Sequence, residues 1–342
     1  AAKDAIDRKL VQYARSQGHV RLVNALAKVY APLLGKTSLD PMSNVLVSIG
    51  ATESLFLAFM AFCNPGDEVV LIEPFYDSYP ACVSLAGGKP VFVPLRPQQP
   101  NASSADSKLD MEEYRRAITP KTKMLVVNNP SNIPGKVFSR KELEDIAKLA
   151  VEHDLLVVSD EVYEWMVYDD ANTPKEGHVR MATLPGMWER TITIGSAGKA
   201  FSVTGFKVGW SLAHAPLIEA LQAVHTHATF SVSSPLSDAI AVALEQAESR
   251  NYFSQLKAMF TQKRERLTKV LEGAGLKTIA PQGSYFILAD TSKIPDEKFL
   301  DKDLLATGAP DATRDYQFCR WLIKNIGVAA IPPSAFYSKE HA

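Results

Sequence analysis

The sequence predicts an α/β fold in which a mainly parallel sheet is sandwiched by helices, with a smaller α+β domain beside it. Two observations lead to this prediction. Short apolar, β-branched segments alternate with helical patterns, and several of these segments are apolar throughout. Uniformly apolar segments indicate strands covered on both faces, and repeated strand–helix–strand order predicts parallel pairing. After about residue 230, charged helices and short strands replace that order.

Seven segments have the length and composition of buried strands, which predicts a seven-stranded sheet. They are residues 44–49, 68–74, 90–95, 123–129, 155–162, 191–196 and 208–214. The segments between them have helical patterns. In one of them, Ser139 and Glu142 have the spacing of a capping box, and the residues that follow place apolar side chains at helical intervals. A helix is therefore expected to begin there.

The C-terminal part predicts a small domain built from both kinds of element. We expect helices over 251–275 and 315–327, strands over 276–281, 283–290 and 328–334, and a long surface loop over 294–312. The polar helical pattern of residues 1–17 is expected to pack with these elements. This assigns residues 36–235 to a large cofactor-binding domain, and residues 1–35 and 236–342 to the small domain.

Charge and apolar patterning exclude several partners. Lys and Arg total 37 against 38 Asp and Glu, so neither nucleic acid nor an acidic membrane surface is an expected partner. No apolar run has the length needed to cross a bilayer. Cys63, Cys82 and Cys319 are too far apart in sequence for a metal-binding pair, and three sparse cysteines fit a reduced compartment. We predict no metal site and a cytoplasmic location.

The chain begins without Met, inside a helical pattern, so we expect it to be truncated. A targeting segment upstream, a mitochondrial one included, would lie outside this sequence.

Polar, ionisable and aromatic side chains follow five of the predicted strands. Open parallel sheets bind ligands at the carboxyl ends of their strands, so these residues form the candidate site. In chain order they are Ala51 and Thr52 after Gly50, Tyr76, Asn128 and Asn132, Asp160 and Tyr163, and Ser196, Lys199 and Lys207. Each alone has an ordinary explanation, such as a helix entry, a cap or a surface amine. Their order and spacing together favour a site.

A lysine, a carboxylate and an anion-binding helix start fit one cofactor, pyridoxal 5'-phosphate. This cofactor needs an amine for a Schiff base and a carboxylate beside its pyridine nitrogen. Its phosphate needs the N–H groups of a helix N-terminus, a hydroxyl and a cation, and an aromatic face can stack on its ring. Lys199 and Lys207 are both candidates for the Schiff base, with Lys199 preferred.

Three motifs resemble those of the class I aminotransferases of fold type I. SAGKAFSVTGFKVGW (196–210) is similar to the cofactor-lysine motif, NNPSNIPGKVF (128–138) to the Asn-Pro loop, and SDEVYEWMVYD (159–169) to the Asp-to-Tyr strand end. The phrases GDEVVLIEPFYDSY, RMATLPGMWERTITIGSAGK and AAIPPSAFYS resemble the branch of kynurenine aminotransferases and cysteine-conjugate β-lyases. The resemblance runs from about Val11 to the end of the chain.

The resemblance implies a role for each residue of the site. Lys199 forms the Schiff base and moves the substrate's α-proton. Asp160 pairs with the pyridine nitrogen, and Asn132 and Tyr163 bond the ring hydroxyl. The remaining implied contacts are phosphate binding by Ser196, Lys207 and the backbone of Ala51 and Thr52, stacking by Tyr76, and a substrate-side position for Asn128. Tyr13 matches a tyrosine that reaches the phosphate of the neighbouring subunit, which implies a homodimer with shared sites.

The chain departs from the family pattern at several positions. Ile133 separates Asn132 from Pro134, which we expect to shift the backbone beside the cofactor. Glu53 stands where relatives often have Gly, so its carboxylate must point away from the phosphate. Ser231 replaces a frequent His near the substrate. The family's arginine for the substrate carboxylate falls beyond Ala342, and its N-terminal glycine-containing loop is missing.

The resemblance implies an aminotransferase that exchanges an amino group between a large neutral, aromatic or sulfur-bearing amino acid, such as kynurenine or glutamine, and a 2-oxo acid. Elimination from cysteine conjugates is an implied side reaction. Three alternatives stay open: a lyase or synthase on the same fold, a cofactor-binding short form with little catalysis, and a nicotinamide-dependent dehydrogenase. Against the last alternative, this chain has no G-x-G-x-x-G motif after the first predicted strand, where a nicotinamide-binding fold would carry it.

Overall fold

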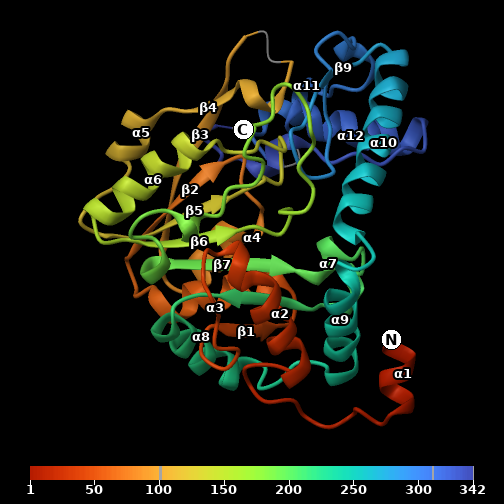
Figure 1. Ribbon diagram of the computed structural model, residues 1–342. Coiled ribbons are helices and arrows are strands. Elements are labelled where there is room, and N and C mark those ends of the chain that lie inside the picture. Colours follow the sequence, from red (N-terminus) through yellow and green to blue (C-terminus); the bar gives the residue numbers. More distant parts are fainter. Residues whose placement is uncertain (100–101, 310–311, 342) are drawn as a thin grey trace.

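The computed structural model describes residues 1–99, 102–309 and 312–341, and one large sheet forms its centre (Figure 1). The strands lie in the order β1-β8-β7-β6-β5-β2-β3-β4. Their bounds are Val45–Ser48 (β1), Glu68–Glu73 (β2), Lys89–Pro97 (β3), Ser107–Leu109 (β4), Thr122–Asn128 (β5), Leu156–Asp160 (β6), Thr191–Ser196 (β7) and Gly209–Leu212 (β8). All seven predicted strands are present, and β4 makes an eighth.

The sheet is mainly parallel, as the sequence predicts. The pairs β2–β3, β2–β5, β5–β6 and β6–β7 are parallel. Strand β8 runs antiparallel to both β1 and β7, and β4 runs antiparallel to the end of β3. Strands β1, β2, β5, β6 and β7 therefore share one direction, and their carboxyl ends meet at one edge. Strand β4 was not predicted, because its three residues, Ser-Lys-Leu, carry no recognisable strand pattern.

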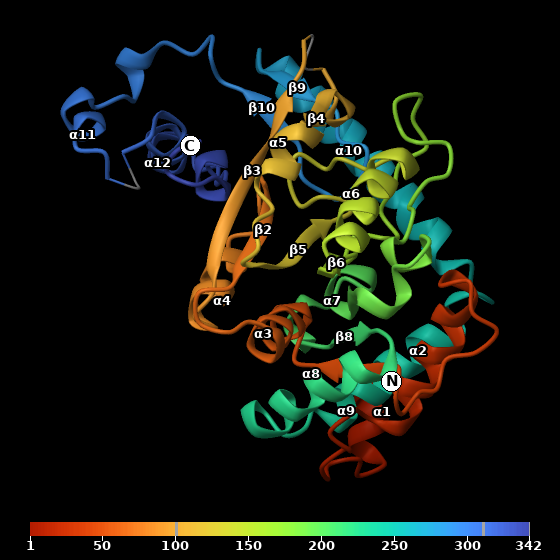
Figure 2. The ribbon, with the colours of Figure 1, turned by 90° about the vertical axis from the view of Figure 1, so that its left-hand side faces the viewer.

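Helices cover both faces of the sheet, which confirms the predicted sandwich (Figure 2). On one face lie α3 (Ala51–Phe62), α4 (Ser78–Leu85) and α8 (Ala215–Ala228), and on the other lie α2 (Val20–Leu33), α5 (Met111–Arg116), α6 (Arg140–Glu152) and α9 (Ser234–Ala247). Alternate residues of β2 and β5 point into opposite clusters, Leu71 and Val126 into one and Val70 and Val127 into the other. Helix α6 begins at the predicted capping box of Ser139 and Glu142.

The C-terminal part agrees with the prediction in its helices and its first strand pair. It contains α10 (Tyr252–Gly273), the antiparallel pair β9 (Lys277–Ile279) and β10 (Leu288–Asp290), and α12 (Arg314–Asn325). The predicted loop over 294–312 instead contains a 3₁₀ turn at Asp296–Lys298 and α11 (Lys302–Ala306), while residues 310 and 311 lie outside the described residues.

Two sequence predictions are wrong at the ends of the chain. The strand predicted over 328–334 is not formed: Val328 and Ile331 are more than half exposed, and a 3₁₀ turn follows at Pro333–Phe336. In the sheets that the described residues form, no strand lies beside this segment to pair with it. The N-terminal helix is shorter than predicted, because α1 (Ala2–Asp7) ends before Lys9, whose φ of 59° is left-handed.

Helix α1 lies against α9, at the opposite end of the molecule from α12 (Figure 2). Helix α2 packs on β1 and β8 through Leu22, Leu26 and Tyr30. The domain boundaries at residues 35 and 235 stay a prediction. Among the described residues, no helix is long and apolar enough to cross a membrane.

Candidate active site

A cavity of about 160 Å³ lies at the sheet edge where the parallel strands end. Ten of the eleven residues predicted from the sequence line it: Ala51, Thr52, Tyr76, Asn128, Asn132, Asp160, Tyr163, Ser196, Lys199 and Lys207. They come together because β1, β2, β5, β6 and β7 share one direction. Strand β8 is reversed, so the loop before it, which carries Lys207, reaches the same edge. The tertiary structure thus brings two amines, one carboxylate and one helix start to a single cavity.

The Lys199 amine lies between two tyrosines. Lys199 belongs to α7 (Ala197–Ala200), the short helix directly after β7. Its Nζ donates a 2.7 Å hydrogen bond to the hydroxyl of Tyr285 and lies 5.3 Å from that ring and 5.8 Å from the ring of Tyr163. Sequence reasoning missed Tyr285, which precedes β10. Its only signal was an aromatic residue in a predicted strand.

Asp160 is buried at the end of β6. The Tyr79 hydroxyl donates a 2.6 Å hydrogen bond to its Oδ2, and the Val162 N–H donates to its Oδ1 at 3.3 Å. Burial raises the pKa of Asp160 to about 6, and the bonds from Tyr79 and Val162 oppose that rise. A cationic ring nitrogen beside this carboxyl group would favour its ionised form. Tyr79 is a second residue that sequence reasoning missed.

A hydrogen-bonded chain joins the Asn-Pro loop to the end of β6. The Tyr163 hydroxyl donates to Asn132 Oδ1 at 2.9 Å, and the Asn132 N–H donates to Asn128 Oδ1 at 2.5 Å. Asn128 Nδ2 then donates to the Asp160 carbonyl at 3.0 Å. Despite Ile133, the side chain of Asn132 lines the cavity. These contacts fix three polar groups around the space where a planar ring would lie.

The start of α3 forms an anion cradle. Gly50 has φ 77° and precedes Ala51, the first residue of the helix, and the first N–H groups of a helix have no intrahelical acceptor. A Cβ on Gly50 would lie 3.1 Å from Lys207 Nζ, and one on Gly209 would lie 2.5 Å from the Ala51 nitrogen. Lacking these Cβ atoms, the cradle leaves room for an anion between the helix start and the Lys207 amine.

Glu53 points away from this cradle, as the sequence analysis required. Its Oε1 accepts hydrogen bonds from Thr229 at 2.6 Å and from His225 Nδ1 at 3.0 Å, and its Oε2 accepts one from the Ile49 N–H. Burial raises the pKa of Glu53, but these bonds outweigh burial and hold the pKa below its usual value. The carboxylate is therefore hydrogen-bonded on the side that faces α8.

Tyr13 does not reach the cavity of its own chain. Its ring is 82% exposed and packs edge-on against Phe230, with 5.3 Å between ring centroids. Ser231, the next residue, donates to the Ala14 carbonyl at 3.1 Å. Among the described residues, no group of three or more His, Cys, Asp or Glu side chains could hold a metal ion.

Residues 1–341 match the family model described as "Aminotransferase class I and II". The chain is 47% identical over 340 residues to a kynurenine–oxoglutarate transaminase of Dictyostelium discoideum. The aligned region covers 96% of this chain and 77% of that protein. Two solved structures are similar over nearly the whole chain. Bna3p from Saccharomyces cerevisiae has a TM-score of 0.90 and 36% identity, covering 99% of this chain and 79% of that one. The N-succinyldiaminopimelate aminotransferase of Mycobacterium tuberculosis has a TM-score of 0.85 and 38% identity, with 98% and 80% covered.

Proposed function

The chain belongs to the class I and II aminotransferase family, and we propose that it transfers an amino group between an amino acid and a 2-oxo acid at the cavity around Lys199. The observation that carries this proposal is the convergence of the Lys199 amine, the Asp160 carboxyl group and the α3 N-terminus in one cavity. These are the groups that pyridoxal 5'-phosphate chemistry requires. The residues fit that cofactor, because the start of α3 and the Lys207 amine line the same cavity, and Gly50 has no side chain to fill the space beside that amine.

Bound pyridoxal 5'-phosphate supplies an aldehyde that reacts with amines and a ring that accepts electrons. Asp160 would lie beside the ring nitrogen, where its negative charge keeps that nitrogen protonated. Asn132 and Tyr163 would form hydrogen bonds with the ring hydroxyl, and Tyr76 would stack on the ring. The phosphate-binding set would be Ser196, Lys207 and the N–H groups of Ala51 and Thr52.

Lys199 would act twice. Its Nζ would hold the cofactor covalently, and as a free amine the same nitrogen would take the substrate's α-proton. The 2.7 Å hydrogen bond from Lys199 Nζ to the Tyr285 hydroxyl supports this role, because it gives the free amine a defined position inside the cavity. Asn128, on the substrate side, would help orient the incoming amino acid.

We propose large neutral, aromatic or sulfur-bearing amino acids as donors, with kynurenine and glutamine as the first to test. The similarity to a kynurenine–oxoglutarate transaminase supports this choice. When the substrate carries a leaving group on Cβ, removal of the same α-proton would lead to elimination, which is the proposed β-lyase side reaction.

We also propose a homodimer in which Tyr13 of each chain reaches the phosphate site of the other. The exposed position of Tyr13 supports this arrangement, because an 82% exposed aromatic ring is free to enter a neighbouring cavity.

The test is the visible absorption of the purified chain with pyridoxal 5'-phosphate, before and after addition of kynurenine or glutamine. We expect a cofactor band that converts to the pyridoxamine form, with a new 2-oxo acid as product. A band that no amino donor changes would overturn the transaminase proposal. Release of ammonia and pyruvate as the main products would instead identify a lyase.

A further inference from the structure

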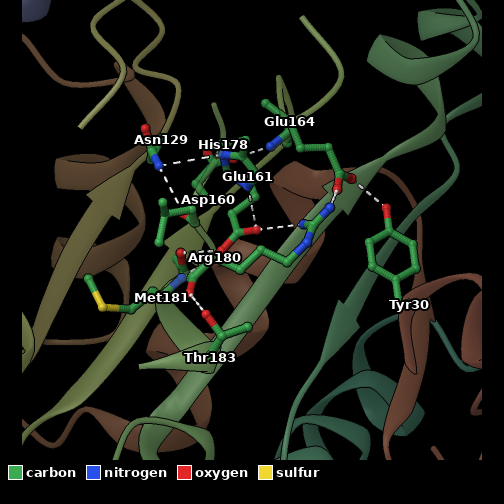
Figure 3. Close-up of polar contacts among 12 residues, drawn as sticks. Tyr30, Asn129, Asp160, Glu161, Glu164, His178, Arg180, Met181 and Thr183 are labelled. Carbon is green, nitrogen blue, oxygen red and sulfur yellow. Dashed lines mark hydrogen bonds and ion pairs between the residues drawn. The ribbon is translucent and has the colours of Figure 1, made fainter. Parts of the chain in front are cut away.

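A cluster of buried ionisable side chains lies beside Asp160 (Figure 3), at the turn formed by residues 160–164. We call it the buried ion cluster, and it consists of Glu161, Glu164, His178 and Arg180. Exposed fractions of the four side chains are between 1% and 7%. Asp160 and Tyr163 line the cavity, whereas the two glutamates of the same turn point to Arg180. One side of the turn therefore faces the cavity, and the other side contacts Arg180.

Arg180 bridges the two glutamates with separate nitrogens. Its Nη1 donates to Glu161 Oε2 at 2.8 Å, and its Nη2 forms an ion pair with Glu164 Oε2. Because a guanidinium is planar and rigid, these two contacts fix the separation of the carboxylates. The spacing of residues 161 and 164 in turn constrains the backbone of the whole turn from 160 to 164.

Further contacts connect the cluster to neighbouring elements. His178 Nε2 lies 2.8 Å from Glu161 Oε2, and Ser159 Oγ donates to Glu161 Oε1 at 2.9 Å. Tyr30 of α2 donates its hydroxyl to Glu164. On the other side, the Asn129 N–H donates to the Asp160 carbonyl at 3.0 Å, and Asn129 Nδ2 donates to the Val179 carbonyl at 3.2 Å. The cluster therefore ties the turn to α2 and to the segment before β7.

Such a cluster is not explained by stability alone. Removing two carboxylates and a guanidinium from water costs free energy that their mutual attraction often does no more than offset, and apolar side chains of similar volume can replace a buried ion pair without loss. What apolar side chains lack is direction. The two directional contacts of Arg180 hold the turn in a more narrowly defined geometry than apolar packing would.

We propose that Arg180 is a positioning residue whose guanidinium holds the back of the 160–164 turn and thereby fixes where Asp160 and Tyr163 lie in the cavity. The inference rests on the proposed function for its consequence, since those two side chains would contact the cofactor. The effect of Arg180 on the turn itself depends on neither cofactor nor activity.

The test compares Arg180→Lys with a matched variant, Arg190→Lys. Lysine keeps the charge but cannot bridge two carboxylates in a plane. Arg190 donates to Asp154 at 2.9 Å and to the Leu155 carbonyl at 3.2 Å, at the opposite end of β6 from the turn. Both variants lose arginine hydrogen bonds, but only the first touches the turn.

The first readout is hydrogen exchange in the protein without cofactor, which is independent of any activity. We expect the backbone amides of residues 160–164 to exchange at least about tenfold faster in Arg180→Lys than in the wild type. Their exchange rates in Arg190→Lys should equal those of the wild type. Affinity for pyridoxal 5'-phosphate should fall about tenfold in the first variant only. Equal protection of the turn in all three proteins would overturn the inference, whether or not the wild type transaminates.

A second variant covers the case in which Arg180→Lys does not fold. The triple change Glu161→Gln, Glu164→Gln and Arg180→Met removes all three charges together, so no unpaired charge stays buried. We expect this variant to fold but to bind pyridoxal 5'-phosphate about tenfold more weakly than wild type. Cofactor affinity and exchange of the turn equal to those of the wild type would show that the cluster has no positioning role.

Discussion

The hydroxyl of Tyr79 donates a 2.6 Å hydrogen bond to Oδ2 of Asp160, and both side chains are buried. Tyr79 comes from α4 and Asp160 from the end of β6, so the bond joins a covering helix to the functional edge of the sheet. It orients the carboxyl group and stabilises its charged form, which burial disfavours. The bond therefore holds the carboxyl group in a fixed orientation at the edge of the cavity.

Asp160→Asn should make the cofactor-free chain more stable at neutral pH. The folded pKa of Asp160, about 6, lies above its usual value of 3.8, so the folded state favours the protonated acid. Wild-type stability should therefore fall as the pH rises from about 4 to 6, by up to about 3 kcal/mol. Denaturant titrations should show the variant more stable than wild type at pH 7.5 and equal to it near pH 4. A stability difference independent of pH would contradict this, and Asp154→Asn, at an exposed residue, is the control.

Lys199→Ala should abolish transamination, with turnover lowered at least about a thousandfold, because the variant lacks both the Schiff-base amine and the proton-transfer group. Mass spectrometry after borohydride reduction should find no cofactor attached. Lys207→Ala is the matched variant: it should keep the covalent attachment but bind pyridoxal 5'-phosphate about tenfold more weakly, because it loses one charged contact to the phosphate. Full turnover by Lys199→Ala would show that the assignment is wrong.

Tyr285→Phe should lower kcat roughly tenfold while leaving the thermal midpoint close to wild type. The variant keeps the ring that packs beside Tyr163 but removes the acceptor that holds the Lys199 amine at 2.7 Å. Steady-state kinetics with the best amino donor gives the measurement. Tyr252→Phe is the control, because Tyr252 packs on Phe201 and Phe253. If both variants lose activity equally, the hydrogen bond has no special role.

Gly209→Ala should destabilise the protein by about 1–3 kcal/mol and weaken cofactor binding. The added Cβ would lie 2.5 Å from the Ala51 nitrogen, and backbone atoms can make room only if the start of α3 moves. Gly205→Ala is the matched change in the loop before β8, since its Cβ would meet nothing within 4 Å. Thermal unfolding and cofactor titration of both variants test the pair. Equal behaviour would mean that the close approach of β8 to α3 is not needed.

Tyr13→Phe should leave the proposed dimer intact but weaken pyridoxal 5'-phosphate binding about fivefold, because one hydrogen bond to the phosphate is lost. Sedimentation equilibrium should give twice the chain mass of 37.5 kDa for both wild type and variant. A monomer mass for the cofactor-loaded wild type, or unchanged cofactor affinity in the variant, would contradict the proposed role of Tyr13.

The local patterns of the sequence were enough to predict the sheet and the residues at its edge. Strands such as β2 and β6 carry consecutive apolar residues (69–72 and 156–158) because both faces of the sheet are covered, and that property is visible in the sequence alone. The carboxyl ends of parallel strands meet at one edge by geometry, so the sequence alone groups Asn128, Asp160 and Lys199 at that edge. Strand β4 and the coil at residues 328–332 were mispredicted, because pairing depends on a neighbouring strand that local sequence does not reveal.

The contacts around the site were decided only by the tertiary structure. Tyr79 and Tyr285 are ordinary aromatic residues in sequence, and they become partners of Asp160 and Lys199 only because α4 and the segment before β10 fold against the sheet. Arg180 likewise meets its glutamates through packing across elements. Periodicity reports how far a residue is buried, whereas hydrogen bonding depends on positions in three dimensions between segments far apart in the chain. The sequence by itself therefore determined the fold class and the chemical groups, and the tertiary structure decided which side chains hold those groups in place.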